Sequence, residues 1–269
     1  MLFSGRQNFR KTIFLRRHKP LLYTIGDLHL SRTVKKPMDI FGARWNGHDE
    51  KIEENWRKKI TTEDTVVIPG DISWAMTLDE ARADFDFIES LPGKKIMLKG
   101  NHDYYWQTKK KLCDFISACG YETMTFLQND AVETEDFIIC GSRGWYNDDK
   151  ENLARGADNK KIIAREVVRL KMSIDAAKKL RDAAAERGEN KEILAFLHFP
   201  AIFKGYMCDE IIMELYRGGI ERCYYGHIHG NYEAPAKISY ADIDFYLVSA
   251  DYLLFDPLAI QKNVDIARR

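Results

Sequence analysis

The chain of 269 residues is poor in cysteine, has no net charge and lacks long apolar runs. Its five cysteines form no CxxC pair, which argues against a disulfide framework and a zinc knuckle. Basic and acidic side chains number 41 each, so the basic excess of a general nucleic-acid binder is missing. No uncharged apolar run approaches the roughly 18 residues that a membrane span needs. We therefore expect a cytoplasmic protein that binds neither membranes nor nucleic acid.

The sequence does have the apolar content of a folded protein, with 45% hydrophobic and 12% aromatic residues. Six basic and no acidic residues lie within the first 20 positions, but no apolar stretch of signal-peptide length follows them. Beyond that point the chain shows no repeat and no linker rich in Ser, Gly or Pro. We predict a basic N-terminal extension over residues 1–20 and a single domain over residues 21–269.

Short apolar runs alternate with segments of helical periodicity. The runs predict buried strands over Leu21–Ile25, Val66–Ile68, Ile96–Leu98, Phe137–Cys140, Ile193–Leu197, Cys223–Tyr225 and Phe245–Val248. Apolar residues at helical spacing predict helices over Asp49–Ile60, Leu78–Leu91 and Ile162–Ala185. Strands that alternate with helices indicate an α/β sandwich. Residues 31–48 and 142–160 are expected to form long loops.

Residues of types that bind metals come immediately after the predicted strands. Five of the seven histidines lie there, and the full set is Asp27, His29, Asp71, Asn101, His102, Asp103, His198, His227 and His229. Because the carboxyl ends of strands in an open α/β sheet converge on one crevice, these side chains could meet. Aspartate, histidine and an asparagine carbonyl suit Mn²⁺, Fe or Zn²⁺. Each fragment alone is also typical of a turn or a core histidine, but their joint occurrence in one order at strand ends favours a metal site.

The same blocks resemble a known superfamily. Gly26-Asp27-Leu28-His29, Gly70-Asp71, Gly100-Asn101-His102-Asp103, His198 and Gly226-His227-Ile228-His229 follow the order found in calcineurin-like metallophosphoesterases, over residues 22–229. The flanking GDLHLS, GDISWAM, GNHDYYW and GSRGW segments are similar to a bacterial branch of predicted phosphohydrolases. The resemblance implies an α/β fold in four layers, an α/β/β/α sandwich of two mixed sheets flanked by helices.

The resemblance also implies a dinuclear metal-dependent phosphohydrolase. Asp27, His29 and His229 would bind the first divalent ion, Asn101, His198 and His227 the second, and Asp71 would bridge both. Two such ions clamp phosphoryl oxygens and lower the pKa of a bridging water, so that a metal-bridging hydroxide attacks phosphorus in line. Mn²⁺ is the expected metal, with Fe or Zn²⁺ as alternatives. The substrate would be a small-molecule phosphomonoester or phosphodiester.

Two neighbouring residues of the third block are expected to act in catalysis. His102 occupies the place of the family's catalytic histidine, which donates a proton to the leaving oxygen or stabilises charge on it. Asp103 matches the residue that often orients or charges that histidine, and a turn cap is the alternative.

One departure from the superfamily bears on the substrate. Phosphoprotein phosphatases continue the second block as GDxVDRG and the third as GNHE, whereas this chain has GDISWAM and GNHDYYW. The arginine that grips phosphate in those enzymes is therefore missing after Asp71. Arg143 could supply the positive charge, although a solvated loop arginine is the alternative. A small-molecule phosphohydrolase is favoured over a protein phosphatase.

Several features allow more than one interpretation. Aromatic residues crowd the motif loops, either as a rim that stacks a base or sugar or as packing beneath the loops: Trp45, Trp74, Tyr104, Tyr105, Trp106, Trp145 and Tyr146. His48 either faces the cleft or only begins the helix after it. A non-catalytic binding or scaffold protein of the same fold is the runner-up function, although such members usually lose ligands. A nuclease is disfavoured by the charge balance, and the oligomeric state is left open.

Overall fold

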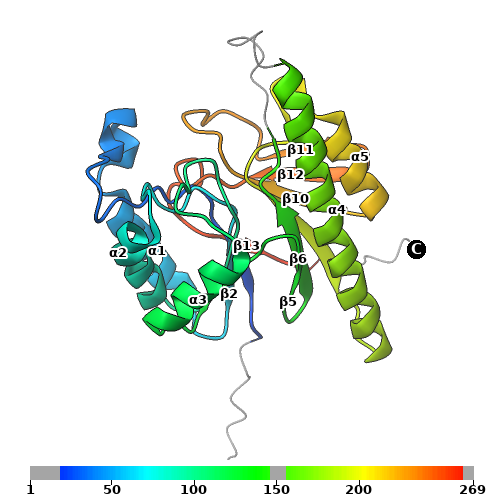
Figure 1. Ribbon diagram of the computed structural model, residues 1–269, viewed down its shortest axis with the longest axis horizontal. Coiled ribbons are helices and arrows are strands. Elements are labelled where there is room, and N and C mark those ends of the chain that lie inside the picture. Colours follow the sequence, from blue (N-terminus) through cyan, green and yellow to red (C-terminus); the bar gives the residue numbers. More distant parts are fainter. Residues whose placement is uncertain (1–18, 146–155, 263–269) are drawn as a thin grey trace, which may run out of the picture.

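The computed structural model describes residues 19–145 and 156–262, so most of the predicted extension over residues 1–20 lies outside the described residues. Two large mixed sheets lie face to face at the centre, and helices cover the outer face of each (Figure 1). This arrangement confirms the predicted α/β fold of two mixed sheets flanked by helices.

The first sheet holds the strands of the N-terminal half and one strand from the end of the chain. Its order is β13 (Leu258–Ile260), β1 (Leu22–Thr24), β2 (Thr65–Ile68), β3 (Lys94–Met97) and β4 (Met124–Phe126). Strands β1 to β4 run parallel, and β13 joins the edge in the antiparallel direction. The covering helices are α1 (His48–Lys59), α2 (Leu78–Ser90) and α3 (Lys109–Cys119).

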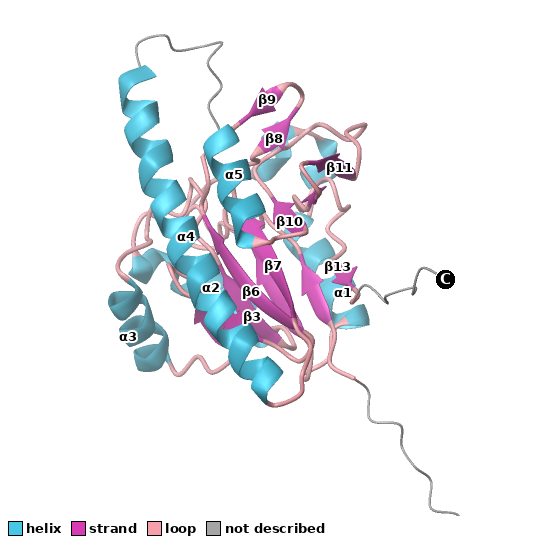
Figure 2. Ribbon diagram, turned by 90° about the vertical axis from the view of Figure 1, so that its right-hand side faces the viewer, coloured by secondary structure: helices cyan, strands magenta, loops and turns pink. Residues whose placement is uncertain are grey.

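The second sheet holds the strands of the C-terminal half. Its order is β11 (Lys237–Tyr240), β12 (Ile243–Leu247), β10 (Arg222–Tyr225), β7 (Glu192–Leu197), β6 (Phe137–Ser142) and β5 (Val132–Glu133). The four central strands are parallel, and the two edge strands are antiparallel. Figure 2 shows α4 (Gly156–Glu186) and α5 (Asp209–Gly218) in front of this sheet.

Smaller elements lie in the connections between the two sheets. The 3-10 turns η1 (Met38–Phe41) and η2 (Ala43–Trp45) interrupt the predicted loop over residues 31–48. The hairpin of β8 (Ile202–Phe203) and β9 (Tyr206–Met207) precedes α5. The predicted loop over residues 142–160 ends earlier than expected, because α4 begins at Gly156; residues 146–155 lie outside the described part of the chain.

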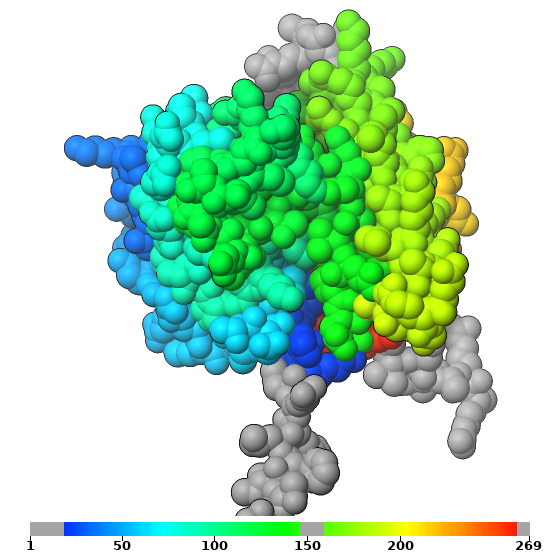
Figure 3. Space-filling model, turned by 60° about the horizontal axis from the view of Figure 1, so that its bottom comes forward, coloured from blue at the N-terminus to red at the C-terminus, as the bar shows by residue number. Residues whose placement is uncertain are grey.

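Buried side chains on alternating sides of the strands build the four layers. In β2, Val66 and Ile68 belong to the apolar cluster beneath the first helices, whereas Val67 belongs to the cluster between the sheets. In β6, Ile139 joins that inner cluster, and Ile138 packs in the cluster beneath α4 and α5. Successive side chains of a strand point to opposite faces, so a strand buried on both faces reads as a continuous apolar run. Figure 3 shows α1 (light blue) and α4 (yellow-green) on opposite flanks.

Among the described residues, no helix is both long enough and apolar enough to cross a lipid bilayer.

Candidate metal centre

The predicted site residues meet where strands of both sheets end, and glycines let their loops approach one another. A Cβ atom on Gly100 would lie 2.1 Å from the backbone nitrogen of Asp71. A Cβ atom on Gly226 would lie 2.4 Å from Oδ2 of Asp27. Both distances are shorter than any real contact, so a side chain at either glycine would force the loops apart. Gly100 is thus required by the close approach of the Asp71 backbone, and Gly226 by the position of the Asp27 carboxylate.

The backbone of several site residues is held in an unusual conformation. The φ angles are 57° at Asp27, 47° at His29, 50° at Asp71 and 70° at His227. A residue with a Cβ atom in this left-handed region costs free energy, and such strain concentrates at functional sites. The turns direct these side chains toward one another instead of leaving them on opposite faces of a strand.

The first donor group combines two residues after β1 with one after β10. Asp27, His29 and His229 each offer a ligand atom, and these atoms lie within 4.8 Å of one another. The Nε2 atoms of His29 and His229 are 3.2 Å apart, and Nε2 of His229 is 3.7 Å from Oδ1 of Asp27. Asp27 and His29 are buried, while the His229 side chain is 30% exposed and opens the group to solvent.

The second donor group lies beside the first. The ligand atoms of Asp71, His198 and His227 also lie within 4.8 Å of one another. Nε2 of His198 is 3.5 Å from Oδ2 of Asp71 and 2.6 Å from Oδ1 of Asn101. Oδ2 of Asp71 also lies 3.7 Å from Nε2 of His29. Asp71 therefore stands between the two groups, where one carboxylate can serve both.

The electrostatics of these groups suit divalent cations. Burial raises the pKa of Asp27 to about 7 and that of Asp71 to about 6. Burial also lowers the pKa of His29 and His198 well below the usual histidine value, and that of His227 to about 2. Neutral imidazoles present lone pairs, and buried carboxylates need a positive partner. Nitrogen and oxygen donors of this kind fit Mn²⁺, Fe or Zn²⁺.

Comparison with known proteins places the chain in a family. The sequence model described as calcineurin-like phosphoesterase matches residues 21–231. The chain belongs to this family. Metal-dependent phosphoester hydrolysis is the activity usual for such phosphoesterases, and the two donor groups provide candidate ligands. No curated protein sequence matches the chain.

Solved structures resemble this chain at low sequence identity. A protein of unknown function from Aquifex aeolicus is 17% identical with a TM-score of 0.49, over 90% of this chain and 96% of the other. A phosphopantetheinyl hydrolase from Mycobacterium tuberculosis is 14% identical with a TM-score of 0.47, over 93% and 99%. A protein from Thermus thermophilus is 9% identical with a TM-score of 0.48, over 90% and 98%.

The candidate centre includes one further carboxylate, that of Asp251, which the sequence patterns did not single out. Oδ1 of Asp251 lies 2.8 Å from Nδ1 of His229, and Oδ2 accepts a hydrogen bond from the backbone of Gly230. Burial lowers the pKa of His229, but the hydrogen bond to Asp251 and the charge of Asp27 raise it to about 9. Asp251 comes soon after the end of the predicted strand Phe245–Val248. Its position therefore gave the same sequence signal that identified the other residues.

His102 lies at the open side of the two donor groups. Its backbone N–H donates a hydrogen bond to Oδ1 of Asp71, and its Nε2 lies 4.0 Å from Oδ2 of the same carboxylate. The side chain is 31% exposed, and burial lowers its pKa. The ring therefore lies beside the proposed bridging carboxylate with one side facing solvent.

Asp103 contacts the backbone of the motif loops and not the ring of His102. Its buried carboxylate accepts hydrogen bonds from the N–H groups of Gly100, Asp71, Ile72 and Ser73 and from the hydroxyl of Tyr105. A carboxylate that binds several amides fixes their relative positions. These contacts favour the turn-cap alternative over the expected role in orienting His102.

Arg143 lies beside the donor groups and not among them. Its side chain is 24% exposed, and Nη2 lies 3.5 Å from Oε1 of Glu166. Its backbone carbonyl accepts a hydrogen bond from the N–H of Phe199, the neighbour of His198. The alternative of a solvated loop arginine does not describe it, because burial lowers its pKa and a buried carboxylate contacts it.

Three of the seven aromatic residues of the motif loops are buried, as the packing alternative describes. Trp45, Tyr105 and Trp106 are buried, and Trp45 packs 5.8 Å from the ring of His29. Trp74 stacks on His29 at 5.0 Å, and Tyr104 is 54% exposed. Trp145 is partly buried, whereas Tyr146 lies outside the described residues.

His48 begins α1 and is buried against the rings of Trp45 and Phe255. The alternative that placed it at the start of the helix is therefore the one that the structure supports.

Proposed function

We propose that this phosphoesterase hydrolyses a small-molecule phosphomonoester or phosphodiester at a dinuclear centre. The observation that carries the proposal is the pair of donor groups joined through Asp71, whose carboxylate lies between His29 and His198. The proposed ligands are Asp27, His29 and His229 for one cation, Asn101, His198 and His227 for the other, and Asp71 for both. Mn²⁺ is the proposed metal, with Fe or Zn²⁺ as alternatives.

When bound, two divalent cations supply Lewis-acid activation of water and neutralise charge on the phosphoryl oxygens. Water then displaces the leaving oxygen in line at phosphorus, with no phosphoenzyme. His102 is placed to stabilise or protonate that leaving oxygen through Nε2, because its ring is partly exposed beside Asp71. Asp251 holds the ring of His229 through Nδ1, which leaves Nε2 directed at the first donor group.

A cytoplasmic location belongs to the same proposal. All five cysteines lie in the described part of the chain, and none forms a disulfide there. Unpaired cysteines are the usual state in a reducing compartment.

The test combines metal analysis with a substrate panel of phosphomonoesters, cyclic nucleotides, dinucleotide polyphosphates and phosphodiesters, assayed with Mn²⁺. We expect a chelator to abolish turnover, added Mn²⁺ to restore it, and Asp71→Asn to lower kcat/KM by about 100-fold or more. Asp79→Asn, at an exposed position of α2, is the matched control and should retain full activity.

Three outcomes would contradict the proposal. Equal activity of the wild type and Asp71→Asn would identify a contaminating enzyme. Tight metal binding without turnover of any ester would favour the scaffold alternative. Faster cleavage of single-stranded DNA or RNA than of every small ester would favour the nuclease alternative.

A further inference from the structure

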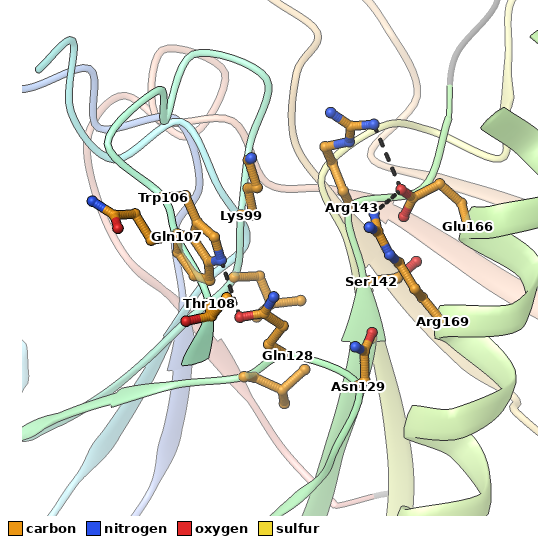
Figure 4. Close-up of a pocket in the computed structure, with 13 residues that line it drawn as sticks. Lys99, Trp106, Gln107, Thr108, Gln128, Asn129, Ser142, Arg143, Glu166 and Arg169 are labelled. Carbon is orange, nitrogen blue, oxygen red and sulfur yellow. Dashed lines mark hydrogen bonds and ion pairs between the residues drawn. The ribbon is translucent and has the colours of Figure 1, made fainter. Parts of the chain in front are cut away.

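A cavity of about 260 Å³ is lined by residues at and after the ends of strands from both sheets. Figure 4 shows Lys99 and Arg143 on opposite walls, one following β3 and the other following β6. Lys99 is two positions before Asn101, and the backbone of Arg143 bonds to the neighbour of His198. The cavity therefore shares its loops with two of the proposed metal ligands.

The cavity carries more positive than negative charge. Lys99, Arg143 and Arg169 line it, and Glu166 is the one acidic residue among its lining residues in the described part of the chain. Nη1 of Arg169 lies 2.6 Å from Oε1 of Glu166, and Nη2 of Arg143 lies 3.5 Å from the same oxygen. One carboxylate thus faces two guanidinium groups, and Lys99 adds a third positive charge.

The positive groups are only partly compensated by the protein. Lys99 is half-buried, and within residues 19–145 and 156–262 its amine forms no hydrogen bond or ion pair. Nε of Arg143 is buried and has no hydrogen-bond partner among the described residues. Partly buried cations that lack counter-ions are costly, and a bound anion would remove that cost.

The neutral part of the lining also suits a phosphorylated ligand. Gln107, Gln128 and Asn129 contribute amides, and Thr108 and Ser142 contribute hydroxyl groups. An amide or hydroxyl can donate to a phosphate oxygen, and the fork of an arginine matches two such oxygens at once.

We propose that this cavity, lined by Lys99, Arg143 and Arg169, binds a second phosphate group of the substrate. The substrate class is then a small ester that carries at least two phosphates, one at the metal centre and one in the cavity. This inference rests on the proposed function, because it takes the scissile phosphate to lie beside Asp71. Lys99 connects the proposed metal centre with the cavity, because it lies in the same loop as Asn101 and lines the cavity.

The first experiment measures binding of inorganic phosphate to the metal-free protein by calorimetry. Without metal, no cation can hold phosphate at the centre, so binding that depends on Lys99 reports on the cavity. We expect Lys99→Gln to weaken binding about tenfold, the effect of losing one charge-assisted hydrogen bond. Lys171→Gln is the matched control, because Lys171 is exposed on α4 and pairs with Asp175. Absence of phosphate binding, or equal affinity of the wild type and Lys99→Gln, would overturn the inference.

The second experiment compares glucose 6-phosphate with glucose 1,6-bisphosphate as substrates in the presence of Mn²⁺. We expect kcat/KM to be about tenfold higher for the bisphosphate. In Lys99→Gln the ratio of the two kcat/KM values should fall to about one, whereas Lys171→Gln should keep the wild-type ratio. A ratio that Lys99→Gln leaves unchanged would contradict the assignment of the cavity.

The two experiments separate the two proposals. Phosphate binding that depends on Lys99, together with no turnover of any ester, would overturn the proposed function and support an anion site. Turnover of both glucose phosphates at equal kcat/KM would leave the proposed function standing and overturn the second phosphate site. Lys99-dependent binding together with equal kcat/KM would show that the anion is a separate molecule and would overturn the substrate class.

Discussion

Nδ1 of His229 lies 2.8 Å from Oδ1 of Asp251, a carboxylate 22 residues later in the chain. A histidine that binds a metal through one nitrogen commonly donates its other N–H to a carboxylate, which fixes the tautomer and the ring orientation. Here the contact leaves Nε2 of His229 facing His29 and Asp27. We therefore propose that Asp251 acts as a positioning residue for one donor group.

The role of Asp251 can be tested by metal titration. We expect Asp251→Ala to weaken Mn²⁺ binding about 10- to 100-fold, and Asp251→Asn to weaken it less because the amide oxygen can still accept from Nδ1. Asp256→Asn is the control, since that carboxylate pairs with Lys59 at the surface. Calorimetry measures the affinity, and circular dichroism shows whether the variants fold. Unchanged Mn²⁺ affinity in a folded Asp251→Ala protein would argue against the positioning role.

His102 should act in turnover and not in metal binding. We expect His102→Ala to keep the wild-type metal content but to lower kcat by roughly 10²- to 10⁴-fold, the usual contribution of a proton donor. Tyr104→Phe, at an exposed neighbouring position, should change kcat little. Metal analysis and steady-state kinetics on the same preparations test this pair. Full activity of His102→Ala on a phosphoester would remove the residue from the mechanism.

The motif glycines should be intolerant of even one added carbon. A Cβ atom on Gly100 would lie 2.1 Å from both the backbone nitrogen and Oδ1 of Asp71. We expect Gly100→Ala to destabilise the protein by roughly 2–4 kcal/mol and to lower its metal content. Gly188→Ala is the control, because no atom lies within 4 Å of its Cβ position. Its positive φ alone should cost about 1 kcal/mol, and urea denaturation measures both values.

Lys95 should make stability depend on pH in the alkaline range. It is fully buried, and its Nζ donates to the carbonyl of Leu91 and to Oγ1 of Thr123. Burial lowers its pKa to about 8, from 10.5 in an exposed lysine. Between these values the unfolded chain binds more protons than the folded one, so this residue makes stability rise with pH.

The measurement is the free energy of unfolding at pH 8 and at pH 10. The wild type should gain roughly 2–3 kcal/mol relative to Lys95→Met over that interval, since one pKa unit corresponds to about 1.4 kcal/mol. For Lys94→Met, at the exposed neighbouring position, the free energy of unfolding should change with pH as it does in the wild type. If the free energy of unfolding changed equally with pH in the wild type and in Lys95→Met, Lys95 would not titrate in this range.

Local patterns were sufficient to predict the fold class and to nominate residues for the centre. Each nominated residue directly follows a buried run, and the end of a buried strand is visible in sequence as an abrupt change from apolar to polar residues. The predicted helices correspond to α1, α2 and α4 within a few residues at each end, apart from the earlier start of α4. The predicted strands correspond to β1, β2, β3, β6, β7, β10 and β12.

Other features depend on contacts that no local pattern records. No helix was predicted for α3 or α5, and strands of two or three residues such as β5 and β13 leave almost no periodic signal. The direction of the Asp103 carboxylate depends on how two loops pack, which spacing does not reveal. The pairing of Arg143 with Glu166 joins a strand end to a helix, and only the folded arrangement brings them together.

Each donor group takes ligands from both sheets: Asp27 and His29 from the first with His229 from the second, and Asp71 from the first with His198 and His227 from the second. Neither half of the chain can therefore assemble a complete group alone. We therefore expect metal ions to bind only after the two halves have docked during folding, and bound ions to stabilise the docked arrangement. Only a completely folded molecule would then bind both metal ions.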